Sequence, residues 1–213
     1  TGEILDADIL FEANGFRGFR NTWRNIVNPV TAAEAFEMAL GVGEWAAPDP
    51  NLPGMELPGF GSALEAQGAL AGLVLTARGE LDPGDPLPNE LLRQYTTWLV
   101  MHEVGHTLGL RHNFRSSAST PMDRLHNTEF TGRNGVYSSV MDYPTVNLAR
   151  PGERNGDYYT YRAGSYDRWA ISYAYTQSQD DANDIAREVA DLGHMYGTDL
   201  DARAALDPTI TRY

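Results

Sequence analysis

Three of the five histidines in this chain lie within eleven residues, in the segment HEVGHTLGLRH at positions 102–112. His102 and His106 are four residues apart, so on a helix their side chains share one face and lie about one turn, or roughly 6 Å, apart. Both can therefore reach one metal ion. Gly109 tolerates the positive φ that ends a helix and reverses the chain, which would bring His112 back toward the same ion. The segment thus requires a helix, a turn and a metal centre held by three histidines.

The residue types favour zinc and hydrolysis. Neutral imidazoles suit Zn²⁺, and a catalytic zinc ion takes three protein ligands and leaves a fourth position for water. Glu103 follows the first ligand, and we expect it to act as the general base on that water and not as a ligand. The same carboxylic acid can then protonate a departing amine, so the segment predicts cleavage of a peptide bond. A structural zinc site normally has four protein ligands, and the chain has no cysteine to complete one.

Composition excludes several other classes of function. The net charge is -13 and the basic residues form no run, which argues against a nucleic-acid partner. Without cysteine there is neither a disulfide framework nor thiolate chemistry. No stretch reaches the roughly 18 apolar residues of a membrane span, and the first ten residues do not resemble a signal peptide. The chain begins with Thr1 and not with methionine, which we interpret as the mark of a processed or trimmed product.

Periodicity predicts the following elements. Residues 3–11 alternate apolar and polar as in a strand, and residues 31–41 carry a capping box and a glycine stop typical of a short helix. Residues 62–79 are ambiguous, and a helical turn followed by a strand at 70–77 is favoured. Asn89 is placed to cap a long helix to Leu108. Its apolar face would consist of Leu91, Leu92, Tyr95, Trp98, Leu99 and Met101. Later segments are loop-rich at 110–160 and helical at 166–178 and 181–194.

The segment at 102–112 resembles the HExxHxxGxxH signature of the metzincin clan of zinc endopeptidases. Its five fixed positions are matched by His102, Glu103, His106, Gly109 and His112. The resemblance implies that the three histidines bind Zn²⁺ and that Glu103 is catalytic.

The clan's second mark is a tight turn with a methionine beneath the zinc site. SSVMDYP supplies Met141, 29 residues beyond His112 (141 − 112 = 29), and we expect it to pack under the histidines without binding the metal. Two residues later comes Tyr143, where astacins and serralysins carry a tyrosine that binds zinc or hydrogen-bonds the oxyanion. The alternative for Tyr143 is a tyrosine that only lines the cleft wall.

Three segments resemble a narrower group within the clan. HEVGHTLGLRHNF, SVMDYP and GSYDRWAISYAY are similar to large bacterial secreted metzincins related to a cholera-toxin-like metalloprotease toxin chain, from about residue 90 onward. This resemblance implies a secreted or periplasmic location and a protein or peptide substrate. Asn113 departs from the better-known branches, because it is not the glutamate of astacins, the proline of serralysins or the aspartate of adamalysins.

The resemblance implies an α+β fold, a metzincin-type catalytic domain with a small mixed sheet, a long active-site helix and an irregular lower subdomain that carries the Met-turn. Residues 1–213 would form this single domain, with 1–109 as the upper and 110–213 as the lower subdomain. The strand at 3–11 resembles the edge strand that runs along the substrate, yet it stands first. We therefore expect that N-terminal strands are missing, and that a preceding segment or a second chain completes the sheet. The alternative is that residues before 80 rebuild the sheet in another order.

Two other functions remain open. A binding module could keep this shell without turnover, although the retained Glu103 argues against it. A zinc amidase could use the same ligands and base on a non-protein amide such as a peptidoglycan cross-link. The remaining histidines, His126 and His194, are expected to be surface or locally bonded residues. Clustered aspartates favour solvated turns and helix caps over a calcium site, and they are Asp82, Asp85, Asp180, Asp181 and Asp184.

Overall fold

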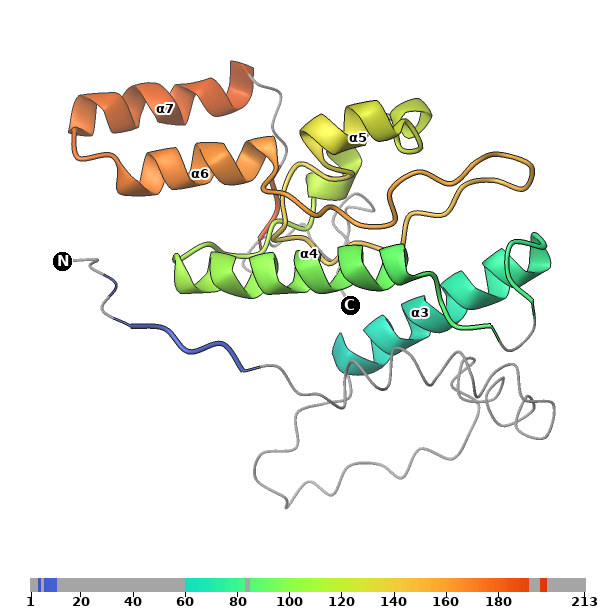
Figure 1. Ribbon diagram of the computed structural model, residues 1–213. Helices are drawn as coiled ribbons and strands as arrows, with labels where there is room; N and C mark the ends of the chain where they lie inside the picture. Colours follow the sequence, from blue (N-terminus) through green and yellow to red (C-terminus); the bar gives the residue numbers. More distant parts are fainter. Residues whose placement is uncertain (1–3, 5, 11–59, 83–84, 192–195, 199–213) are drawn as a thin grey trace. The chain divides into compact units, whose positions relative to one another are not determined.

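The computed structural model describes residues 4, 6–10, 60–82, 85–191 and 196–198 (Figure 1). They fall into two units, one made of described residues between 10 and 88, the other of those in 1–9 and 89–212. We describe each unit by itself. The expected single domain with subdomains 1–109 and 110–213 stays a prediction.

Helix α3, Phe60–Ala77, belongs to the first unit. It buries Ala71 and Leu75, which are four residues apart, and exposes Leu70 and Leu73. This is the spacing of one helix face. The strand predicted at 70–77 is therefore wrong. Its apolar run continues the helix, because alanine and leucine are strong helix formers and a short apolar run has no period that separates helix from strand.

The described residues contain no strand, so the expected small mixed sheet is wrong for this part of the chain. Residues 4 and 6–10, which cover most of the strand predicted at 3–11, have no regular secondary structure. Alternation tells which side chains would share a face of a sheet, but a strand also needs a hydrogen-bonded neighbour. The helix predicted at 31–41 lies outside the described residues.

The second unit contains the remaining described helices. In chain order these are α4 (Asn89–Thr107), η1 (Ser116–Ser119), η2 (Met122–Arg124), α5 (Thr128–Asn134), α6 (Ser165–Tyr175) and α7 (Gln179–Asp191). The long helix predicted from Asn89 is confirmed as α4, one residue shorter than expected. The two later helices are confirmed as α6 and α7, which lie side by side (Figure 1). Trp169 Nε1 on α6 donates a hydrogen bond of 2.6 Å to the Ile185 carbonyl on α7.

One face of α4 forms the core of this unit. Its buried residues recur every three or four positions: Leu91, Gln94, Tyr95, Trp98, Leu99, His102 and Gly105. The Trp98 ring packs against that of Tyr159, with centroids 5.8 Å apart, and against that of His102, with centroids 5.5 Å apart. The apolar face of α4 thus continues directly into the histidine segment. None of the described helices is long and apolar enough to cross a membrane.

Candidate metal centre

The C-terminal end of α4 reverses the chain through Gly109. Gly109 has a φ of 84°, its N–H donates to the His106 carbonyl at 2.9 Å, and the Leu110 N–H donates to the Gly105 carbonyl at 3.0 Å. These two bonds form a Schellman motif, in which a residue with positive φ follows the helix. The turn predicted from Gly109 is confirmed.

This turn also orients the second histidine. His106 Nδ1 lies 3.0 Å from the Leu110 carbonyl oxygen. Because a carbonyl oxygen only accepts, Nδ1 carries the proton and the lone pair of a neutral ring is on Nε2. The chain then returns His112, whose Nε2 lies 3.1 Å from His106 Nε2. Two nitrogens bound to one tetrahedral zinc at about 2.0–2.1 Å would lie roughly 3.3 Å apart, so the spacing fits zinc.

The first histidine is oriented from a distant part of the chain. His102 Nδ1 donates a hydrogen bond of 2.8 Å to the Val140 carbonyl, 38 residues away. The side chain is buried, and its Nε2 is one of the buried polar atoms without a hydrogen-bond partner in the described chain. Burial lowers the pKa of His102 to about 4, so the ring is neutral at pH 7. A buried nitrogen with a lone pair and no donor to accept from is suited to a metal ion.

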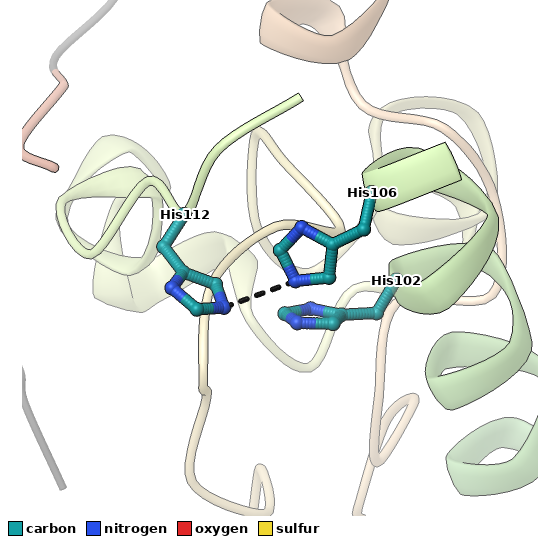
Figure 2. A group of neighbouring side chains, drawn as sticks. All are labelled: His102, His106 and His112. Carbon is teal, nitrogen blue, oxygen red and sulfur yellow. Dashed lines mark hydrogen bonds between the residues drawn. The ribbon is translucent and has the colours of Figure 1, made fainter. Parts of the chain in front are cut away.

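The three rings face one another (Figure 2). One ligand nitrogen from each of His102, His106 and His112 lies within 4.8 Å of the other two. It is the one group of three or more potential metal-binding side chains among the described residues. The structure thus brings together all three histidines that the sequence predicts as ligands.

The two predicted catalytic residues, Glu103 and Tyr143, lie on α4 and after the 138–142 turn, respectively. Glu103 is partly buried on α4, and no hydrogen bond or ion pair engages its carboxylate within the described residues. The Tyr143 ring centroid lies 4.5 Å from that of His112 and 4.9 Å from that of His102. The Tyr143 ring therefore packs on two of the three histidine rings.

Met141 lies buried beneath the histidine segment. Its Sδ touches Gly105, where an added Cβ would overlap the sulfur. Glycine at 105 therefore lets the 138–142 turn approach α4 closely. This agrees with the packing role expected for Met141. The sequence did not reveal the role of Gly105, because a helical glycine carries no pattern of its own.

Asn113 has a structural role at the site that the sequence did not predict; there it only differs from the residue of the better-known metzincin branches. It is fully buried, its N–H donates to the Met141 carbonyl at 2.9 Å, and its Oδ1 accepts from the Gly197 N–H at 3.2 Å. The neighbouring Phe114 N–H donates to the Gly197 carbonyl at 2.8 Å. The residue after the third histidine thus joins the 138–142 turn to the segment at 196–198.

Two buried aspartates were also missed. Asp142 Oδ2 accepts from Ser116 Oγ and from the Ser117 N–H, both at 2.8 Å. Asp167, on α6, bonds the 138–142 turn. Burial raises the pKa of both carboxyl groups, and these hydrogen bonds oppose the rise. A signal was present for Asp167: it lies three residues after Gly164, the position from which an acidic side chain caps a helix.

None of the other candidates within the described residues belongs to the group formed by the three histidines. His126 Nδ1 accepts from the Gly156 N–H at 3.3 Å, 30 residues away, and His194 lies outside the described residues. The aspartates lie in turns and on α7: Asp82 N–H donates to Asp85 Oδ2, Asp180 and Asp181 open α7, and Asp184 pairs with Arg187.

The comparisons with known proteins agree with this site. A family model described as Met-zincin matches residues 84–213, which include α4 and all three histidines. Neither the curated proteins nor the solved structures gave a match to the chain. The family match and the histidine cluster together indicate a metalloprotease with a zinc site.

Proposed function

The chain belongs to the Met-zincin family, and from this premise we propose that it is a zinc-dependent endopeptidase that cleaves protein or peptide substrates. The observation that carries the proposal is the convergence of His102, His106 and His112. Glu103 follows His102 on α4 and is partly buried. When bound, zinc would lower the pKa of a water molecule and polarise a substrate carbonyl. A structural site, by contrast, normally has four protein ligands.

The protein's own groups divide the remaining tasks. The histidines would hold the ion through Nε2, with the rings of His102 and His106 fixed by the Val140 and Leu110 carbonyls. Glu103 would accept the proton of the attacking water and deliver it to the departing amine. Its carboxylate is suited to this because no hydrogen bond or ion pair engages it among the described residues. Tyr143 would contribute its hydroxyl to the developing oxyanion.

The test is Glu103→Gln. We expect the variant to keep its zinc and to lose turnover by at least about 10³-fold, since no other base is proposed. Glu129→Gln is the matched control, because Glu129 is an exposed glutamate on α5 that pairs with Arg133. Zinc content and cleavage of a mixed peptide library are measured on both. A Glu103→Gln enzyme with the wild-type rate would show that another group activates the water.

The same assay separates the two rival functions. A zinc-loaded wild-type chain that cleaves no peptide in the library but opens cross-linked peptidoglycan fragments would be an amidase. One that binds zinc and cleaves neither would be a binding module. We further propose a secreted or periplasmic location, which fractionation of the source cells tests.

A further inference from the structure

Both backbone groups of Val140 are held by hydrogen bonds. Its carbonyl accepts hydrogen bonds from His102 Nδ1, at 2.8 Å, and from Trp98 Nε1, at 3.1 Å. Its N–H donates to Asp167 Oδ2 at 2.9 Å. The backbone of one residue, Val140, therefore connects a carboxylate on α6 with a metal-ligand histidine on α4.

The Asp167 carboxylate is itself fixed in place. It is buried, its Oδ1 accepts from Ser139 Oγ at 2.6 Å, and its Oδ2 accepts a second N–H, that of Gly164, at 2.7 Å. Ser139 Oγ in turn accepts from the Met141 N–H at 3.0 Å. An added Cβ at Gly164 would overlap the Ser138 carbonyl, so the start of α6 and the 138–142 turn are in direct backbone contact. The carboxylate thus organises the whole turn.

We propose that Asp167 is a positioning residue for the metal ligand His102, acting through the backbone of Val140. The proposal rests on the metal site of the proposed function and assigns to it a residue that touches neither metal nor substrate. Asp167 holds the N–H groups on both sides of Val140: that of Val140 directly, and that of Met141 through Ser139 Oγ. These bonds fix the direction of the Val140 carbonyl, and that carbonyl fixes the tautomer and the plane of the His102 ring. The Met141 N–H belongs to the same peptide unit as the Val140 carbonyl, so the Asp167–Ser139–Met141 chain of hydrogen bonds polarises this peptide and makes its carbonyl a stronger acceptor.

Mutation of a residue that orients a metal ligand normally lowers the metal affinity about 10- to 100-fold. In Asp167→Asn the side chain keeps its shape, but one of the two oxygens becomes an NH₂ group that cannot accept from Val140, Gly164 or Ser139. We expect the affinity for Co²⁺, used as a spectroscopic probe for zinc, to fall by at least about tenfold. The visible absorption of the bound Co²⁺ should also shift, because the His102 ring changes its orientation.

The matched control is Asp157→Asn. Asp157 is also buried and accepts from Gln94 Nε2, at 2.9 Å, and from Thr131 Oγ1, but it bonds no residue of the metal centre. We expect this variant to lose thermal stability and to keep both the Co²⁺ affinity, within about twofold, and the wild-type absorption spectrum. Equal losses of affinity in the two variants would mean that Asp167 acts only on stability, and would overturn the proposal.

A milder variant covers the case in which Asp167→Asn does not fold. Ser139→Ala removes the Ser139 bond to Oδ1 and leaves the Val140 bond in place. We expect about threefold weaker Co²⁺ binding with a smaller spectral shift in the same direction. Wild-type affinity in this variant would contradict the proposal. If the wild-type chain itself binds no metal, the proposed function fails. If it binds metal and the Asp167 and Ser139 variants bind it equally well, only this inference fails.

Discussion

His102 and His106 lie one turn apart on α4, yet the carbonyl groups that orient them come from very different places. Leu110, which orients His106, is four residues away, and Val140, which orients His102, is 38 residues away. The first arrangement needs only the local turn at Gly109. The second needs the 138–142 turn to be held against α4 by Asp167, Met141 and Asn113. The metal centre thus has a local half and a distant half, and the distant half depends on tertiary packing.

The largest effect should come from Gly164→Ala, which disturbs the packing that holds the distant half of the centre. The new Cβ would overlap the backbone carbonyl of Ser138, and no flexible side chain there can move aside. We expect the free energy of unfolding to fall by about 3 kcal/mol or more. Urea unfolding of the metal-free chain measures it.

Gly132→Ala on α5 is the control for this substitution. The nearest atom to its new Cβ is Tyr161 Oη at 4.0 Å, and alanine is favoured inside a helix. This variant should be at least as stable as the wild type. If Gly164→Ala were equally stable, the close contact between α6 and the turn would be unimportant.

The second effect is a loss of folding stability as the pH falls. Burial holds the pKa of His102 at about 4 in the folded chain, below the ordinary value of 6.5. The unfolded chain then binds a proton at His102 more readily, so the stability that the neutral ring contributes is present above pH 6.5 and is lost as the pH falls toward 4. The loss is at most about 3 kcal/mol.

The contribution of His102 is isolated by comparison with His102→Gln, both chains metal-free. Asp142 and Asp167, whose raised pKa values work in the opposite direction in acid, are common to both chains. We expect the difference in the free energy of unfolding between the two to shrink from pH 7 to pH 4. A difference independent of pH would show that His102 is protonated as easily in the folded as in the unfolded chain.

Gly105→Ala should have a medium effect. Its Cβ would overlap Met141 Sδ, but methionine is flexible and can retreat in part, so we expect a loss of about 1–3 kcal/mol. A double-mutant cycle with Met141→Ala checks the cause. If the contact is responsible, the double variant is less destabilised than the sum of the single variants. Additive losses would mean that the two residues do not interact.

The smallest effect should come from Gly109→Ala in the local half. An added Cβ meets nothing within 4 Å, so only the positive φ of 84° opposes the change, at a cost of about 1 kcal/mol. The Leu110 carbonyl stays with His106, and Co²⁺ affinity should remain within about threefold. A loss above about tenfold would remove the distinction between the two halves.

The same division explains what the sequence could predict. The helix from Asn89, the turn at Gly109 and the convergence of the three histidines follow from spacing within twenty-odd residues, and the structure has all of them. The role of Val140 was not predictable, because Val140 contacts His102 through its backbone carbonyl, a group that every residue has. Asp167 and Asn113 carry ordinary polar side chains whose partners are distant. The predicted strands at 3–11 and 70–77 failed for a related reason, since a strand is defined by a neighbour that the local pattern does not contain.

The hydrogen bond between Asn113 and Gly197 has a consequence for the order of events during synthesis. The two residues are 84 positions apart, and they join the segment at 196–198 to the residue beside His112. When α4 and the Gly109 turn have just emerged from the ribosome, His106 already has its acceptor, whereas Val140, Asp167 and Gly197 have yet to emerge. At that stage His106 is oriented by the local turn and His102 lacks the Val140 carbonyl. We therefore expect the complete centre to take up metal only after residue 197 has emerged.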